Sequence, residues 1–307
     1  MNRKSIIIAA AILTIVIGTV LLYPKTQPQQ GNETLKITAS FYPLAYFAEQ
    51  IGGEKVQVST LIPYNTEAHS WQPSFSDITK TQDSDLIIYL GAGLDPWMET
   101  NVIKSINTEG KTILKASAGI HLINGTDEDE HGGTDPHLWV SPYTALNIAE
   151  NIYNAIKETD PENTEYYQQN WEQLKEALTS LDQKYQTELQ PAQGKTFFTT
   201  HSAYGYVANR YDLEQHGVIG LSADEQPSTS KIAEIVDQMI KDQSYVIYVD
   251  PIYSDEYAQM LKTELTSKTG KNVDILQLYL MLGPLGELDY MGQLNANLNN
   301  LKQGLIN

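Results

Sequence analysis

The sequence predicts an α/β protein with two lobes, in which strands and helices alternate along the chain. From Leu35 onward, short runs of β-branched residues alternate with longer segments of helical pattern, which is typical of βα units on a largely parallel sheet. The alternation occurs twice, and a long helical segment lies between the two halves. With 307 residues, the chain is long enough for two domains of ordinary size.

The first half provides three strands and three helices. Its predicted strands are rich in β-branched and aliphatic residues and cover residues 35–40, 56–61 and 85–90. Its predicted helices lie in the intervals and cover residues 43–51, 74–82 and 97–106. Ser74, followed by Asp77 three residues later, predicts a capped start for the second of these helices.

The second half repeats this arrangement. Its predicted strands include the sequences TFFTT, YVIYVD and VDILQL and cover residues 196–200, 245–250 and 273–278. Its predicted helices cover residues 203–211, 230–242, 254–269 and 292–304. The two halves therefore predict two separate α/β lobes, at residues 35–161 and 190–307.

A long helix is predicted to connect the lobes. Ser141-Pro142 and Asp160-Pro161 each place an N-cap residue before a proline at the first helical position, so a helix begins at both places. The second helix continues over residues 162–189 without an internal glycine or proline. At about 1.5 Å per residue it spans about 40 Å, enough to cross between the lobes. A helical connection predicts limited closure of the lobes.

The N-terminus predicts a membrane segment. Arg3 and Lys4 precede an almost unbroken apolar run over residues 6–23, which is long for a signal-peptide core and has no small-x-small cleavage site. We expect residues 1–23 to be an uncleaved signal anchor with the rest of the chain outside the cell; a cleaved signal peptide is the alternative, which would leave the protein secreted or periplasmic. Residues 24–34 are rich in proline and glutamine, which predicts a tether between the membrane segment and the folded part.

Composition excludes several classes of function. The formal net charge of −18 argues against a nucleic-acid partner, because a protein that tracks phosphates needs a basic face. Cysteine is absent, which excludes disulfides, thiolate metal sites, cysteine nucleophiles and a lipidated N-terminal cysteine in this sequence.

Three histidines suggest a metal site. His69, His137 and His201 each follow a strand or loop and precede a helix start, and ligands of open parallel sheets bind at such junctions. Three neutral imidazoles that converge there would bind a transition metal. His121 and His216 have no comparable context, and we expect both to be structural.

Four ordered segments resemble one protein family. Residues 67–78 (EAHSWQPSFSDI), 135–142 (DPHLWVSP), 200–213 (THSAYGYVANRYDL) and 248–254 (YVDPIYS) are similar, in order and spacing, to segments of the zinc/manganese-binding solute-binding proteins of ABC importers. The resemblance extends from about residue 35 to residue 305. It implies two Rossmann-like lobes with parallel sheets, bridged by a rigid helix, with the metal in the cleft between them.

The resemblance also assigns roles. It implies that His69 and His137 are ligands from the first lobe and that His201 is a ligand from the second. Zinc-type members have histidine at the position of His201, whereas manganese-type members tend to have a carboxylate there. Imidazole chemistry agrees, because nitrogen ligands favour Zn²⁺ over Mn²⁺. The expected cargo is therefore Zn²⁺, with a manganese-binding receptor as an alternative. The expected partners are an ABC permease and its ATPase, and we expect a monomer without enzymatic activity.

The fourth ligand is the point at which the sequence departs from the family. The family's usual carboxylate follows the strand that corresponds to VDILQL, where this chain has Tyr279, a poor zinc ligand because its phenol must first lose a proton. Glu67, Glu287 and Asp289 are the candidates for the missing carboxylate. A water molecule could equally complete the tetrahedron.

Two further functions are open at this point. Three histidines and a water form the geometry of a catalytic zinc, so a surface-anchored zinc hydrolase with Glu67 or Glu287 as general base is an alternative. No HExxH signature supports it. The other is adhesion, in which the metal would be structural.

Overall fold

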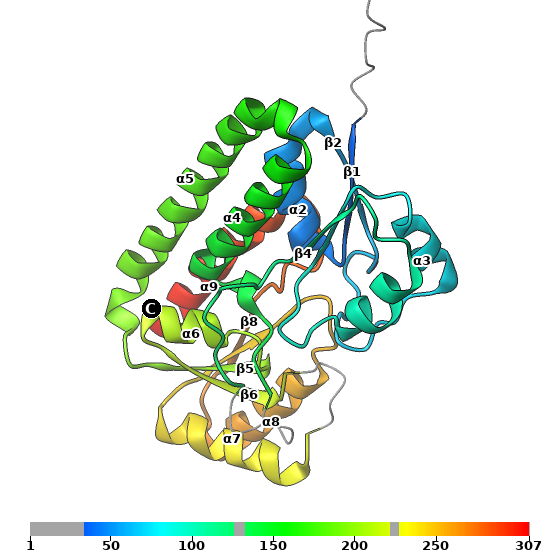
Figure 1. The fold of residues 1–307 in the computed structure, drawn as a ribbon. Helices are drawn as coiled ribbons and strands as arrows, with labels where there is room; N and C mark the ends of the chain where they lie inside the picture. Colours follow the sequence, from blue (N-terminus) through cyan, green and yellow to red (C-terminus); the bar gives the residue numbers. More distant parts are fainter. Residues whose placement is uncertain (1–33, 126–132, 222–226, 307) are drawn as a thin grey trace, which may run out of the picture. The chain divides into compact units, whose positions relative to one another are not determined.

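A computed structural model describes residues 34–125, 133–221 and 227–306, which form two four-stranded, fully parallel sheets (Figure 1). The predicted anchor at residues 1–23 and residues 24–33 of the predicted tether lie outside the described residues. Among the residues that are described, no helix is long and apolar enough to cross a membrane.

The first sheet has the strand order β2-β1-β3-β4. Its strands are β1 (Leu35–Ala39), β2 (Val56–Thr60), β3 (Leu86–Tyr89) and β4 (Thr112–Lys115). β1 and β3 are largely buried because helices cover the sheet, as expected for parallel strands. The helices of this first lobe are α2 (Tyr42–Gly52), α3 (Phe75–Thr81) and α4 (Pro142–Thr159).

The second sheet has the order β6-β5-β7-β8, which repeats the topology of the first. Its strands are β5 (Thr196–His201), β6 (Glu214–Ile219), β7 (Val246–Val249) and β8 (Asp274–Gln277). The helices of this second lobe are α6 (Gly205–Tyr211), α7 (Thr229–Lys241) and α8 (Glu256–Thr269), and α9 (Tyr290–Ile306) ends the described chain. The prediction of two α/β lobes is confirmed.

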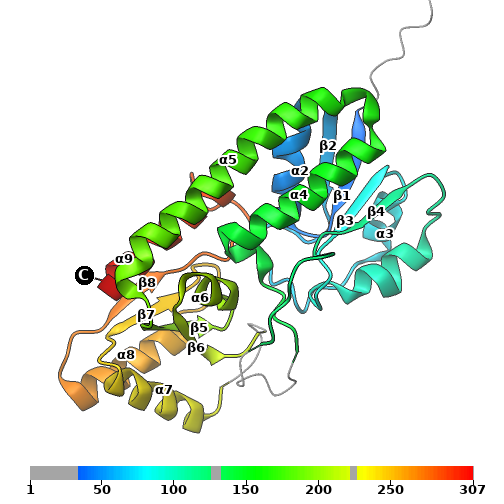
Figure 2. The same cartoon turned by 60° about the vertical axis from the view of Figure 1, so that its left-hand side comes forward.

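The predicted connecting helix is present as α5 (Thr164–Leu189), which follows a 3₁₀ turn at Pro161–Asn163. Its buried residues recur every three or four positions, so one stripe of the helix faces the protein interior. The helix packs against α2 and α4 of the first lobe and against α6 and α9 near its end (Figure 2). α5 therefore runs along both lobes.

One apolar core extends through both lobes. Successive residues of a strand point to opposite faces of the sheet, so Phe197 and Phe198 enter different cores. Phe198 belongs to a small core formed with α7 and α8, whereas Phe197 belongs to the large core that continues into the first lobe. The two lobes therefore share buried surface, which opposes their separation.

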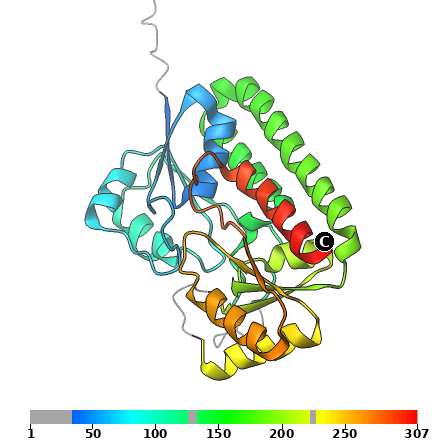
Figure 3. The same ribbon diagram turned by 180° about the vertical axis from the view of Figure 1, so that it is seen from behind.

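Helix α9 adds a second connection between the lobes (Figure 3). At its start, the Tyr290 ring packs edge-on against Phe47 of α2, and its hydroxyl donates to the Trp139 carbonyl. Near its end, Lys195 before β5 donates to the Leu305 carbonyl (2.5 Å). The contacts of α9 with both lobes do not define where one lobe ends. The lobe boundaries at residues 35–161 and 190–307 therefore stay a prediction.

Three details differ from the sequence prediction. β4 and β6 were not predicted, and the predicted helix at residues 97–106 is a π-helical turn (Met98–Val102) followed by a 3₁₀ turn (Ile103–Ser105). There, the Thr100 hydroxyl donates to the Pro96 carbonyl (3.0 Å). Residue 217 in β6 is glycine because a Cβ at this position would lie 1.9 Å from the Ser202 hydroxyl. This glycine interrupts the β-branched pattern of the strand.

The shared core predicts a large effect of shortening one α5 side chain. Leu178 is fully buried, so Leu178→Ala should lower the free energy of unfolding by about 2–5 kcal/mol through lost burial and a residual cavity. Urea unfolding of the full chain followed by circular dichroism measures this. Glu176→Ala on the exposed face of α5 is the control and should change stability by less than about 0.5 kcal/mol. Equal effects of the two changes would contradict the packing of α5.

Candidate metal centre

His69 lies in the loop between β2 and α3, and this loop is held at both ends. On one side, Asn65 donates its main-chain N–H to the Leu282 carbonyl (2.8 Å), which lies in the chain between β8 and α9. On the other side, Ser74 and Asp77 form the predicted reciprocal cap at the start of α3. These contacts restrain the loop, which carries the half-buried imidazole of His69.

His137 is positioned by Asp135, two residues earlier. One oxygen of the Asp135 carboxyl group accepts the main-chain N–H of His137 (2.8 Å) and lies 2.9 Å from its Nδ1. This contact favours the tautomer with the proton on Nδ1, which leaves the lone pair of Nε2 available to a metal. The side chain of His137 is almost fully buried.

His201 is the last residue of β5 and is also buried. Its carbonyl accepts hydrogen bonds from Thr199 (2.8 Å) and Gln215 (3.1 Å), which fix the end of the strand. Its Nε2 lies 2.8 Å from the Leu221 carbonyl, and its Nδ1 is buried without a hydrogen-bond partner within the described part of the chain.

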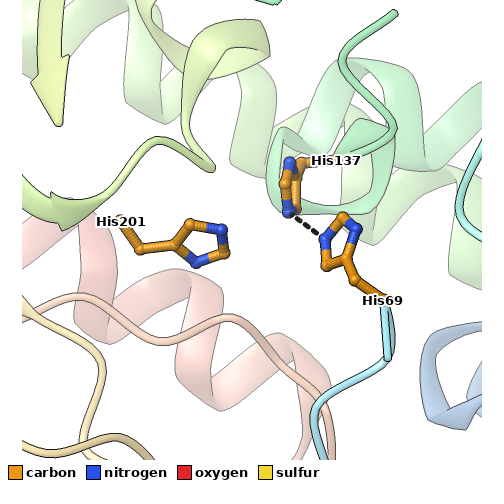
Figure 4. Close-up of side chains that lie close together, drawn as sticks. All are labelled: His69, His137 and His201. Atoms are coloured by element: carbon orange, nitrogen blue, oxygen red, sulfur yellow. Dashed lines mark hydrogen bonds between the residues drawn. The ribbon is translucent and has the colours of Figure 1, made fainter. Parts of the chain in front are cut away.

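The structure brings these three histidines together (Figure 4). One ring nitrogen from each can be chosen so that all three lie within 4.8 Å of one another. The Nε2 atoms of His69 and His137 are 3.2 Å apart. The ring centroid of His201 lies 5.1 Å from the ring centroid of His137 and 6.2 Å from the ring centroid of His69. The cluster thus joins two side chains of the first lobe to one of the second.

Burial favours the neutral forms of His137 and His201. Desolvation lowers the pKa of His137 well below its ordinary value and also lowers the pKa of His201, while the nearby carboxylate of Glu67 opposes both shifts. Burial raises the pKa of Asp135 to about 7, against the hydrogen bond from the His137 main chain. Neutral imidazoles offer lone pairs, so this arrangement is suited to binding a cation.

Among the described residues, no carboxylate completes the cluster of ligand atoms. Glu67 lies nearest in sequence, but its Oε1 accepts the main-chain N–H of His69 (2.9 Å) and its Oε2 accepts the hydroxyl of Tyr253. Both of its oxygens are therefore already held. Glu67 nevertheless lies close enough to affect the pKa of His137 and His201.

The two later acidic candidates lie elsewhere. Glu287 is exposed in the loop before α9. Asp289 accepts the main-chain N–H of Gly292 (2.8 Å) at the start of α9 and the hydroxyl of Tyr46 (3.2 Å). Neither joins the histidine cluster among the described residues.

Tyr279 occupies the place where the family's carboxylate was expected. Its hydroxyl donates to Gln277 (2.5 Å), and burial raises the pKa of its phenol above the ordinary value. The phenol therefore stays protonated at neutral pH, which agrees with its expected weakness as a zinc ligand.

Asp250 was not singled out from the sequence. It follows β7, is buried, and accepts the main-chain N–H groups of Ile252 (2.8 Å) and Leu280. Glu67, Asp135 and Asp250 share one local pattern, in which a carboxylate accepts the N–H two residues later. Asp250-Pro251 repeats the Asp-Pro pair of Asp135-Pro136, and this pair is the sequence signal that could have identified Asp250.

The two histidines expected to be structural lie outside the cluster. His216 is in β6, where its ring stacks on Phe198 with a centroid distance of 5.7 Å. His121 is exposed in the loop that follows β4.

Comparison with known proteins decides the family. The model of the family described as "Zinc-uptake complex component A periplasmic" matches residues 37–304. The chain belongs to this family. The high-affinity zinc uptake system protein ZnuA of Bacillus subtilis (strain 168) is 33% identical over 294 residues, which cover 92% of this chain and 91% of the relative.

Two further similarities involve AdcA of Streptococcus pneumoniae. The zinc-binding lipoprotein AdcA of strain R6 is 30% identical over 291 residues, which cover 90% of this chain but 56% of the relative, so this chain spans about half of AdcA. The crystal structure of the Zn(II)-bound ZnuA-like domain of AdcA has a TM-score of 0.75 at 29% identity and covers 89% of this chain and all of that domain.

The burial of the cluster predicts its protonation state without metal. Both His137 and His201 should titrate below pH 6.5, because burial disfavours their charged forms. NMR titration of the imidazole C–H resonances measures this, with His137→Gln and His201→Gln assigning the signals. Since each folded-state pKa lies below that of the unfolded chain, these two groups should also reduce stability as the pH falls from about 6.5. Half-protonation of either imidazole at or above pH 6.5 would contradict the account.

Proposed function

We propose that this protein is an extracytoplasmic receptor that captures Zn²⁺ between its lobes and delivers it to the permease of an ABC importer. The observation that carries the proposal is the convergence of His69, His137 and His201 from two lobes, with one nitrogen of each within 4.8 Å of the others. We propose these three side chains as the protein ligands. Residues 35–161 and 190–307 are the proposed lobes that provide them.

Zinc is the proposed cargo for two reasons. Neutral imidazole is a good ligand for Zn²⁺, and at a site of three nitrogens the general affinity order places Zn²⁺ above Mn²⁺. The family description and the named relatives also refer to zinc. A manganese-binding receptor is the less favoured alternative, because the cluster among the described residues contains no hard oxygen ligand.

Delivery requires partners. The sequence contains no P-loop of the form G-x-x-x-x-G-K-[ST] and only one long apolar run, so it has no visible means of driving transport. The family is described as one component of a zinc-uptake complex. We therefore propose an ABC permease and its ATPase as partners, and a monomeric receptor.

The location follows from the N-terminal sequence. Arg3 and Lys4 before the apolar run at residues 6–23 support a signal anchor that leaves the folded part outside the cell. A relative is named a lipoprotein, and the family description includes the word periplasmic. This sequence has no cysteine to carry a lipid, so we propose the apolar run itself as the anchor.

A zinc hydrolase is not favoured. Its general base would be Glu67 or Glu287, but Glu67 is held by His69 and Tyr253, and Glu287 is exposed in the loop before α9. Zinc-dependent turnover of an ester or peptide panel that disappears in Glu67→Gln would support the hydrolase instead. A purely structural metal is also disfavoured, since the large core is continuous without it and should keep the metal-free protein folded.

Loss of one histidine should abolish tight zinc binding. His201→Ala should raise the zinc dissociation constant by more than about 100-fold, beyond the 10–100-fold typical of removing a group that only supports a ligand. Competition with a fluorescent zinc chelator measures the constant. His121→Ala is the matched control and should leave it unchanged, because His121 lies outside the cluster. Unchanged zinc affinity in His201→Ala would show that the proposed site is wrong.

A further inference from the structure

Glu67 and Tyr253 form a contact between the two lobes. Glu67 belongs to the restrained loop of the first lobe, two residues before His69, and Tyr253 follows β7 in the second lobe. The Tyr253 hydroxyl donates to Oε2 of Glu67. The Tyr253 ring also lies edge-on to His201, with a centroid distance of 6.0 Å. This hydrogen bond therefore joins the lobes directly beside the three histidines.

The two acid-x-His segments use their carboxyl groups differently. In Asp135-Pro136-His137, one oxygen accepts the main-chain N–H of the histidine and also contacts its Nδ1. In Glu67-Ala68-His69, Oε1 accepts the corresponding main-chain N–H (2.9 Å), but Oε2 is directed to Tyr253. The carboxyl group of Asp135 thus orients the imidazole of His137, whereas the carboxyl group of Glu67 is held by Tyr253 of the second lobe.

Glu67 is near the cluster without joining it. Burial lowers the pKa of both His137 and His201, and in each case the charge of Glu67 acts in the opposite direction, so its carboxylate is within electrostatic reach of both rings. Its oxygens are not part of the group of ligand atoms within 4.8 Å, as far as the described residues show. The Glu67 carboxylate is thus close to the histidines but held outside their group of ligand atoms.

We propose that Tyr253 is a positioning residue that keeps the Glu67 carboxylate out of the metal's coordination shell and thereby sets the preference for Zn²⁺ over Mn²⁺. The inference rests on the proposed function. With Glu67 held by Tyr253, the proposed ligands among the described residues are all imidazoles, which favour zinc. A carboxylate added to this set would supply the hard oxygen that Mn²⁺ prefers.

The hydrogen bond is of a kind that can hold a carboxylate. An O–H group that donates to a charged oxygen forms a stronger bond than one between neutral partners. Replacement of Tyr253 by Phe keeps the ring beside His201 but removes the donor, so Oε2 of Glu67 loses the partner that draws it away from the histidines. A cation bound at the histidines is then available to this carboxylate as a partner.

The test compares metal selectivity in Tyr253→Phe and the wild type. The ratio of the Mn²⁺ to the Zn²⁺ dissociation constant should fall at least ten-fold in the variant, which corresponds to about 1.4 kcal/mol. The visible absorption of the Co²⁺-loaded protein should change as the Glu67 carboxylate takes the place of the solvent neighbour. Tyr46→Phe is the matched control, because Tyr46 donates to the carboxylate of Asp289 (3.2 Å) away from the cluster, and it should change neither measurement.

Removing the Glu67 carboxylate should reverse the effect of Tyr253→Phe. In the double variant Tyr253→Phe/Glu67→Gln, the selectivity and the Co²⁺ spectrum should return to those of the wild type, because an amide is a weak ligand. Glu67→Gln alone should keep the zinc affinity within about three-fold, since Glu67 is held away from the metal. This single variant tests the inference even if Tyr253→Phe does not fold.

Three results would overturn the inference: an unchanged selectivity ratio in Tyr253→Phe, a shift that persists in the double variant, or a ten-fold loss of zinc affinity in Glu67→Gln alone. These outcomes are distinct from failure of the proposed function. That failure would appear as wild-type protein that does not bind zinc, or as zinc binding that does not depend on His201.

Discussion

The rest of the structure depends on the large apolar core that continues from one lobe into the other. α5 and α9 both contribute to it, and Phe197 of β5 packs into the same core as the strands of the first lobe. Separating the lobes would expose this surface to water, which is unfavourable in proportion to the apolar area. The histidines of the two lobes are therefore held near one another by packing that does not involve them.

This constraint explains how the three imidazoles are kept together. Packing places His137 and His201 where water cannot solvate a charge, so both favour the neutral form that a metal requires. A site built in this way needs little lobe closure, in agreement with the helical connection that the sequence predicts. Tyr253 adds selectivity to this arrangement through its hold on Glu67.

The sequence predicts those features that depend on local patterns. The strand-helix alternation, the cap at Ser74 and the long α5 helix all follow from residue periodicity and end signals. β4 and β6 were not found in the same way; in β6, Gly217 is required by a close contact with Ser202, which breaks the β-branched pattern of the strand. The Glu67–Tyr253 contact joins residues far apart in the chain and from different lobes, so no local pattern indicates it.

The central claim is that imidazoles from both lobes bind the same zinc ion, and X-ray absorption at the zinc edge tests it most directly. The account predicts one zinc per chain with three imidazole nitrogens at about 2.0–2.1 Å and a light atom of solvent as the fourth neighbour. In His201→Ala the same measurement should show two imidazoles. A zinc ion with fewer than three imidazole neighbours in the wild-type protein would contradict the account.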